Sequence, residues 1–437
     1  MAGSFVLPPP DHSGVCLQRG RLILTERLGV GSSSTVWLTV DRQSCLHAVK
    51  VLFPPTHKRS VLGPEDTKEW GRGQERMFKR EAKIHALVHN HPNIPTLHHF
   101  FIERGLRCFL LDCCNGGSLA VVLRTPFFWK RDDRIKSVLA QLIDALQHCH
   151  NRGVAHRDIN PENVLFSRDH QRVYLTDFGL ASKGNYSVDF KVGSKSHMSP
   201  ECFGNEFLVE AYNPQISDIW SLGILLLQIL VGYTPWHAPS EDEDPRYAFY
   251  LQYRAALFYD ALPITHGAAA LLSRILEPDP GQRITLDEFR RELEDAGPLT
   301  VTEDDLAYAS KVARNSYRTR VSWLGVPYRV PPRHADLFEP PSYSQHPPAL
   351  TRPPSYADPA APPSPALSSS TELASSFSSS THSSHSIPAL PRSSSYISAT
   401  NPISHTSFYL SNAFPPEPSK HTFRLMSIRK RLTGTTR

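Results

Sequence analysis

The chain has 437 residues, of which 40% are apolar and 20% are charged, and its formal net charge is +5. So small a net charge for this length gives little reason to expect a nucleic-acid partner. All seven cysteines lie within the first 202 residues and none has a metal-finger spacing. This pattern favours reduced thiols in the cytoplasm or the nucleus over disulfides.

No transmembrane segment is expected. The longest apolar run, Leu222 to Val231, is far shorter than the roughly 20 residues that a bilayer requires, so we interpret it as a buried core helix. The first ten residues, MAGSFVLPPP, lack the basic start and apolar run of a secretory signal, and Ala2 excludes N-myristoylation.

Two lobes of different character follow one another along the chain. Between 21 and 111, short β-rich segments such as 34–40 surround one amphipathic helical pattern at 77–88. Between 118 and 296 the pattern turns helical, as in the apolar stretch 216–232. This order of elements predicts an α+β fold with a small β-rich lobe and a larger helical lobe.

Three further segments lack such patterns. Residues 53–73 have no periodicity and contain proline and glycine, which predicts an insertion loop. Serine and proline dominate from Pro340 onward, and a segment with so few bulky apolar residues is expected to be disordered. We therefore divide the chain into an N-terminal extension (1–19), a folded domain (20–297, with lobes 20–111 and 112–297), a partly ordered extension (298–339) and a Ser/Pro-rich disordered tail (340–437).

A glycine-containing hairpin is predicted near the start of the first lobe. Gly29 and Gly31 follow a strand pattern, Ser34 stands where a third glycine is common, and Lys50 comes later in HAVK. Alone, a glycine pair is weak evidence and fits an ordinary tight hairpin equally well. A phosphate-binding loop would use its backbone N–H groups to cover a triphosphate, with the lysine on the α and β phosphates.

Two further motifs lie downstream. VAHRDINPENVLF contains Asp158 and Asn163, and YLTDFGLAS contains Asp177. With the glycine hairpin and Lys50, these motifs reproduce the order and spacing of the eukaryotic protein kinase family, which the chain resembles over about residues 20–297. All of them in the right order make coincidence improbable.

The resemblance implies a role for each motif residue, with ATP and Mg²⁺ as cofactors. Phosphoryl transfer needs a cation on the phosphates, oxygen ligands for the metal and an acceptor for the hydroxyl proton. By resemblance, Lys50 is the cation on the phosphates, Asn163 and Asp177 supply the oxygen ligands of the metal, and Asp158 accepts the hydroxyl proton. Glu81 matches the helix glutamate that pairs with the lysine, and Glu75 is a less favoured rival.

The resemblance also places an adenine pocket between the lobes. Asp112, Cys113 and Cys114 would form the connector that offers backbone groups to the base. The remaining nucleotide-contacting residues are expected to be Leu28, Gly29, Val30, Gly31, Ser32, Ser33, Ser34, Val36, Ala48 and Leu165.

Other positions are expected to support the site or regulate it. Glu201 would pair with Arg283, and Asp218 would brace the catalytic loop. In this family, an arginine directly before the catalytic aspartate, here Arg157, often accompanies phosphorylation of the activation segment. The serines in range of it are Ser187, Ser194 and Ser196, of which Ser194 is expected to serve the catalytic aspartate instead.

One catalytic position departs from the family pattern. Asn160 stands where most serine/threonine kinases have a lysine that contacts the transferred phosphate. Asparagine can donate a hydrogen bond but carries no charge, so the transition state would lose a cationic contact. The alternative function is therefore an ATP-binding pseudokinase that acts as a scaffold.

Smaller features point to the substrate class and the subgroup. Pro161 and Glu162 resemble the catalytic loop of serine/threonine kinases, so the expected activity is phosphorylation of protein serine and threonine. The stretch GSKSHMSPECFG and the following second-lobe residues are especially similar to fungal kinases of the Ran/Pat group. That similarity implies a role in nutrient or developmental signalling.

The tail contains two PPxY sequences, Pro340–Tyr343 and Pro353–Tyr356. Such sequences are polyproline-helix ligands of WW domains, and two copies would bind a tandem-WW partner through raised effective concentration. Coincidence within a proline-rich segment is an equally good interpretation.

Overall fold

A computed structural model describes residues 11–31, 33–52, 64–204 and 210–327, apart from the side chains of 64–72. Ser32, the predicted disordered tail at 340–437 and both PPxY sequences lie outside these residues. The proposed binding of a WW domain therefore stays a prediction.

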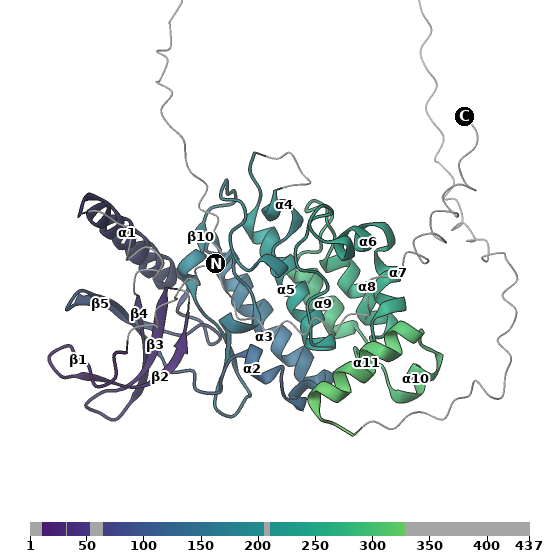
Figure 1. Cartoon of the computed structure of the whole chain (residues 1–437), viewed down its shortest axis with the longest axis horizontal. Helices are drawn as coiled ribbons and strands as arrows, with labels where there is room; N and C mark the ends of the chain where they lie inside the picture. Colours follow the sequence, from purple (N-terminus) through teal and green to yellow (C-terminus); the bar gives the residue numbers. More distant parts are fainter. Residues whose placement is uncertain (1–10, 32, 53–63, 205–209, 328–437) are drawn as a thin grey trace, which may run out of the picture. The chain divides into compact units, whose positions relative to one another are not determined.

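The first lobe is built on an antiparallel sheet with the strand order β1-β2-β3-β4-β6-β5 (Figure 1). Lys50 lies in the central strand β4, opposite Val36 of β3 and Phe109 of β6. The strands are β1 (Cys16–Leu17), β2 (Leu22–Val30), β3 (Ser34–Val40), β4 (Leu46–Leu52), β5 (Leu97–Glu103) and β6 (Leu106–Asp112).

Each face of this sheet has its own small apolar core. Val49 packs with Trp37 on one face, whereas Ala48 packs with Phe78 of helix α1 on the other. Because successive side chains of a strand alternate between faces, Lys50 lies on the same face as Ala48, toward α1. The strand pattern thus directs the lysine at the helix that carries Glu81.

Helix α1 (Pro64–Val88) begins earlier than the sequence predicts. The predicted insertion loop at 53–73 is wrong from residue 64 onward, because that part is helical. Proline is tolerated at the first position of a helix, and Gly71 and Gly73 each cost only about 1 kcal/mol relative to alanine. The packed C-terminal half, with Phe78 and Val88 buried, is enough to carry the helix through them.

The second lobe is helical (Figure 1), and it encloses the largest apolar core among the described residues. With the sheet-based first lobe, this confirms the predicted two-lobed α+β fold. Its helices are α2 (Leu119–Val122), α3 (Asp132–His150), α4 (Pro200–Phe203), α5 (Pro214–Val231), α6 (Pro245–Tyr253), α7 (Ala255–Ala261), α8 (His266–Ile275) and α9 (Leu286–Asp295).

Helix α5 is the central helix of this lobe. It is apolar and long enough to cross a membrane, but 83% of it is buried inside the protein. Trp220 and Leu225, for example, are fully buried. The apolarity of α5 therefore reflects its place in the core.

Short strands and turns in the N-terminal part of this lobe contain the VAHRDINPENVLF and YLTDFGLAS motifs. Strand β7 pairs with β10 and strand β8 pairs with β9. These elements are β7 (Val154–Ala155), η3 (Pro161–Asn163), β8 (Val164–Phe166), β9 (Val173–Leu175), η4 (Phe178–Leu180), β10 (Ser182–Lys183) and η5 (Lys195–His197), where η denotes a 3₁₀ turn; a further turn, η2 (Pro126–Phe128), follows α2.

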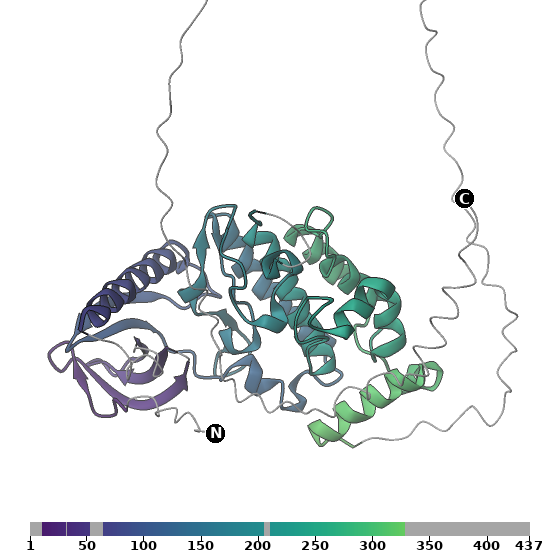
Figure 2. The ribbon, with the colours of Figure 1, turned by 45° about the horizontal axis from the view of Figure 1, so that its top comes forward.

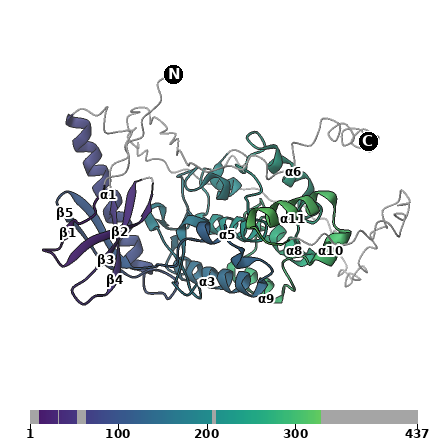
Figure 3. The ribbon, with the colours of Figure 1, turned by 60° about the horizontal axis from the view of Figure 1, so that its bottom comes forward.

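Two helices follow α9 within the segment predicted as a partly ordered extension. They are α10 (Glu303–Tyr308) and α11 (Lys311–Leu324), and α11 lies along the helices of the second lobe (Figures 2 and 3). Asp132 accepts hydrogen bonds from Leu299 N at 2.7 Å and Thr300 Oγ1 at 2.8 Å. The segment after α9 is thereby bound to the start of α3.

Candidate active site

The glycine-containing hairpin joins β2 and β3. Gly29 pairs with Val36, and Gly31 N donates to Ser34 O at 2.8 Å, which closes the turn. Ser34 is buried, and a Cβ built on Gly31 would lie 3.1 Å from Ser34 Oγ. Serine at the third glycine position is therefore accommodated because Gly31 leaves room for its hydroxyl. Leu28, Val30 and Ser33 are exposed along the hairpin.

The connector between the lobes has backbone groups to offer an adenine base. Asp112 N is already used by Thr96 O, and the Asp112 carboxylate is held by Thr96 N and His98 Nε2. Among the described residues, none forms a hydrogen bond with the backbone N–H or C=O of Cys113 or Cys114. Free backbone donors and acceptors beside a partly buried strand end are what base recognition requires, so the connector fits the predicted nucleotide.

The predicted apolar walls of this pocket come from both lobes. Val36 and Ala48 lie on neighbouring strands of the first lobe, where Val36 pairs with Lys50 and Ala48 pairs with Leu38. Leu165 lies in β8 of the second lobe and forms a backbone bridge with Ser118, just after the connector. The chain thus brings these three residues near the connector from two distant segments.

Lys50 is at the centre of a buried charge cluster. Its Nζ lies 2.7 Å from Glu81 Oε1 and 2.7 Å from Asp177 Oδ1. Burial by itself lowers the pKa of Lys50, but the two carboxylates outweigh burial and raise the pKa above its ordinary value. The lysine is therefore held as a cation at the site. Glu75 instead pairs with Lys79 on the surface of α1, which leaves Glu81 as the partner.

Asp177 has a backbone conformation that aims its carboxylate into this cluster. Its φ is +65°, in the left-handed region, and Gly179 N donates to its Oδ1 at 3.2 Å. Phe178 is fully buried against the rings of His85 and His156, which fixes the turn. Burial tends to raise the pKa of Asp177, but Lys50 outweighs it, so the pKa is lowered and the group is a carboxylate.

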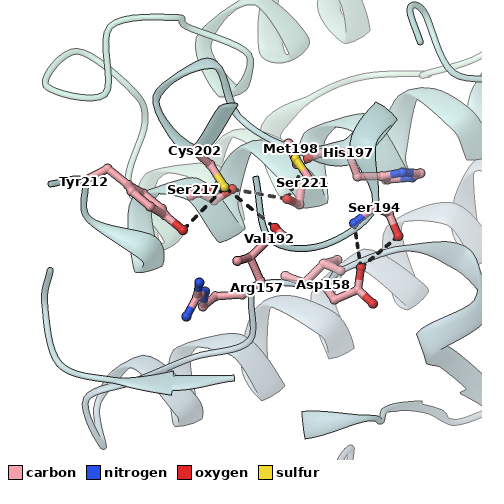
Figure 4. Close-up of a pocket in the computed structure, with 11 residues that line it drawn as sticks. Arg157, Asp158, Val192, Ser194, His197, Met198, Cys202, Tyr212, Ser217 and Ser221 are labelled. Atoms are coloured by element: carbon pink, nitrogen blue, oxygen red, sulfur yellow. Dashed lines mark hydrogen bonds between the residues drawn. The ribbon is translucent and has the colours of Figure 1, made fainter. Parts of the chain in front are cut away.

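Asp158 is held by three hydrogen bonds to its carboxylate, and Figure 4 shows the two that come from Ser194. Its Oδ1 accepts from Ser194 N at 2.9 Å and from Ser194 Oγ at 2.8 Å. Its Oδ2 accepts from Asn163 Nδ2 at 2.9 Å. Such bonds fix the position of the carboxylate, which a proton acceptor in phosphoryl transfer requires.

The same contacts leave suitable oxygens for a divalent cation. Asn163 uses its Nδ2 for Asp158, and no hydrogen bond of the described residues involves Asn163 Oδ1 or Asp177 Oδ2. One amide oxygen and one carboxylate oxygen are hard ligands of the kind that Mg²⁺ prefers, with water and phosphate completing the shell. The donor set fits the predicted metal.

Asn160 is engaged on both sides of its amide group. Its Oδ1 accepts from Glu162 N at 2.8 Å and Asn163 N at 3.2 Å, which caps η3. Its Nδ2 donates to Asp158 O at 3.2 Å and to Ser194 Oγ at 3.0 Å. Both amide hydrogens are thus used within the loop. A contact with the transferred phosphate, as expected from the sequence, requires one of these bonds to break.

The catalytic loop is braced from α5. Asp218 accepts hydrogen bonds from the backbone N of His156 and of Arg157, each at 2.8 Å, and lies 3.0 Å from His150 Nε2. Glu201 and Arg283 form a fully buried bidentate ion pair, with N–O distances of 2.5 and 2.9 Å. The structure therefore contains both predicted supporting interactions: Asp218 with the catalytic loop, and Glu201 with Arg283.

Two contacts of the activation segment were not found from the sequence. The guanidinium group of Arg157 donates hydrogen bonds to the carboxylate and to the backbone carbonyl of Asp189. Arg80 of α1 donates from Nη2 to Ala181 O at 2.7 Å. The sequence shows only that charged residues are present in these segments. Most such residues are exposed, so the sequence does not indicate that these form contacts. Ser187, one of the expected phosphate carriers, is buried and instead accepts from Asp189 N.

Comparisons with known proteins agree with this geometry. The sequence model of the protein kinase domain matches residues 22–292. The "Negative regulator of sexual conjugation and meiosis" of Schizosaccharomyces pombe is 34% identical over 235 residues, which cover 49% of this chain and 50% of that protein.

Two relatives from Saccharomyces cerevisiae are similar over longer stretches. "Serine/threonine-protein kinase KSP1" is 30% identical over 60% of this chain and 25% of its own length. "Serine/threonine-protein kinase CHK1" is 32% identical over 62% of this chain and 50% of its own length. The chain thus spans about half or less of these curated relatives. Because the domain match covers more than half of the chain, the chain belongs to the protein kinase family.

Proposed function

We propose that the chain is a protein serine/threonine kinase that uses ATP and Mg²⁺. The observation that carries this proposal is the arrangement of Asp158, whose carboxylate is held by Asn163 and Ser194 while Lys50 is paired with Glu81 and Asp177. These are the groups that phosphoryl transfer requires, in mutually consistent positions.

The residues divide the work of the reaction. Lys50 presents a permanent cation to the phosphates, while Glu81 keeps its ammonium group in place. Asn163 and Asp177 would hold Mg²⁺ through Oδ1 and Oδ2. When bound, Mg²⁺ would neutralise charge on the γ-phosphoryl group of the nucleotide. Asp158 orients the acceptor hydroxyl and receives its proton, since Ser194 and Asn163 fix both carboxylate oxygens.

Serine and threonine are the proposed acceptors. Relatives of this chain carry the name serine/threonine-protein kinase. The catalytic loop with Pro161 and Glu162 supports the same class. The 34% identity to a negative regulator of sexual conjugation and meiosis supports a place in nutrient or developmental signalling. Expression of this chain in fission yeast that lacks that regulator tests this setting, because restored repression of meiosis is expected.

Transfer of labelled phosphate from ATP to a generic basic protein tests the activity. The full chain is expected to label the protein, and acid hydrolysis is expected to release phosphoserine and phosphothreonine. Asp158→Ala is the matched control and should abolish the label. Equal labelling by both proteins would favour the pseudokinase alternative instead, as would no labelling of either a basic or an acidic substrate protein while ATP still binds.

A further inference from the structure

Two lysines lie beside the acceptor site on the activation segment. We propose that Lys191 and Lys195 form an anion-selective subsite, so that this kinase favours protein substrates with a carboxylate or phosphate group next to the acceptor residue. This inference rests on the proposed function, and it names the class of substrate. It follows from position, from the surroundings of the two ammonium groups and from the local charge balance.

The position follows from the contacts of Ser194. Its N and Oγ both donate to Asp158 Oδ1, and an acceptor hydroxyl must approach the same carboxylate to within about 3 Å. The residues next to the acceptor must therefore pass over the chain at Ser194 (Figure 4). Lys195 is the next residue and begins η5. Gly193 keeps this chain close to the loop, since a Cβ there would meet Arg157 O at 2.3 Å.

Both ammonium groups are gathered at one aromatic ring. Lys191 Nζ lies 4.6 Å and Lys195 Nζ 5.7 Å from the centroid of the Phe203 ring, which is itself buried in α4. The face of an aromatic ring attracts cations but does not neutralise them. Two cations held near one ring therefore leave a positive potential that an anionic group reduces.

Among the described residues, Lys191 and Lys195 are not both balanced by a carboxylate. Lys195 pairs with Glu243 at 2.5 Å, but Lys191 forms no ion pair with a carboxylate among the described residues. The Lys195–Glu243 pair is half-exposed on both sides, with 42% and 37% of the side chains accessible. Because exposed pairs contribute little, an incoming anion can replace Glu243 at small cost.

The backbone at Lys191 adds a further indication. Its φ is +56°, in the left-handed region that a lysine seldom adopts, and its N donates to Cys202 O at 2.9 Å. A residue held in this conformation is fixed by its surroundings and is often found at a functional site. The exposed Lys191 side chain is thus presented from a constrained position.

Matched peptides test the subsite. Each contains one serine acceptor in the same background, with glutamate, glutamine or phosphoserine placed in turn at the two positions before and after it. One adjacent position is expected at which glutamate is preferred over glutamine by up to about fivefold in kcat/KM, mainly through KM. Phosphoserine and glutamate arms show whether a phosphate or a carboxylate is the better anion.

Variants of the chain assign the preference to the two lysines. Lys191→Ala combined with Lys195→Ala should bring the glutamate-to-glutamine ratio to about one, whereas the exposed Lys183→Ala serves as a matched control and should keep it. Glu243→Gln should increase the ratio, since it removes the competing carboxylate from Lys195. A ratio near one in the unmodified chain, or an unchanged ratio in the double variant, would overturn the proposal.

Binding measurements separate this inference from the proposed activity. Fluorescence anisotropy of the same labelled peptides with the full chain reports affinity without phosphate transfer. A preference for the glutamate peptide that the double variant loses supports the subsite even if no transfer occurs. Equal affinity for the glutamate and glutamine peptides contradicts the subsite, whatever the outcome of the transfer assay.

Discussion

Arg157 is held by Asp189 of the activation segment, with Nη1 3.3 Å from Oδ2 and Nη2 3.1 Å from the Asp189 carbonyl oxygen. The Arg157 side chain is only 3% exposed, and its backbone is bound to Asp218. Arg157 thereby links the catalytic loop to the activation segment through a carboxylate that the chain itself provides. We therefore expect that no phosphorylated serine is needed to supply this negative charge.

Asp189→Asn tests this link. The substitution keeps the size of the side chain but removes the charge that Arg157 contacts. Because the Asp189 side chain is 63% exposed, the expected cost is about 1 kcal/mol, or roughly fivefold in kcat/KM. Steady-state kinetics with a peptide substrate measures the effect, and Asp169→Asn in an exposed turn is the matched control. Treatment of the unmodified chain with phosphatase should leave its activity unchanged. Loss of activity after phosphatase would show that a phosphate does this work instead.

Substitutions of Asn160 separate its two functions. Asn160→Ala removes the cap of η3 and should lower stability by about 1 kcal/mol, which corresponds to roughly 2–4 °C in Tm. Asn160→Ser retains an oxygen acceptor for the cap but loses the donor to Ser194, so its Tm should fall less while kcat falls. Asn160→Lys should lower Tm as alanine does and transfer phosphate faster than Asn160→Ala. Thermal melts and initial rates measure both effects; equal melting of the alanine and serine variants would speak against the cap.

The ion pair between Glu201 and Arg283 is expected to contribute strongly to stability. Both side chains are almost fully buried, with 3% and 0% exposed. Removal of one partner leaves a buried charge uncompensated, so Glu201→Ala should lower the free energy of unfolding by about 3–5 kcal/mol. Urea denaturation measures the loss. The exposed pair of Arg131 with Asp133 is the control, since Asp133→Ala should shift the urea midpoint far less than Glu201→Ala.

Two buried histidines make stability depend on pH. Burial lowers the pKa of both His85 and His197 to about 4. Between pH 6.5 and 4 the unfolded chain therefore binds protons that the folded chain does not, and stability is lost as the pH falls through this range. Each histidine contributes a slope of about 1.4 kcal/mol per pH unit. Urea unfolding at pH 7, 6 and 5 should show a shallower slope for His197→Gln; identical slopes would contradict this assignment.

The central groups of the site were predictable because the chemistry restricts the residue types and their order. Lys50, Asp158, Asn163 and Asp177 each have a required charge or oxygen ligand, and the structure places Lys50 beside Asp177 and Asp158 beside Asn163. The partner of Arg157 was not predictable, because Asp189 is one acidic residue in a serine-containing segment and only the fold shows that it faces the arginine.

Other features depend on tertiary structure in the same way. The start of α1 at Pro64 has no periodic signal, since packing of the later turns carries the helix through two glycines. The hydrogen bonds of Asn160 depend on backbone angles of the loop, so the sequence indicated the missing charge but not the cap. The two-lobed fold, by contrast, follows from strand alternation and helical periodicity that are visible in the sequence.

The role of Asp158 is tested most directly by the rate of phosphate transfer measured together with the affinity for ATP. Asp158→Asn keeps the shape of the side chain but removes the proton acceptor. We predict that kcat falls by roughly 10²–10⁴, while the Kd for ATP, measured by titration of the full chain, changes by less than about twofold. A variant that transfers phosphate at the rate of the unmodified chain would contradict the assignment of Asp158.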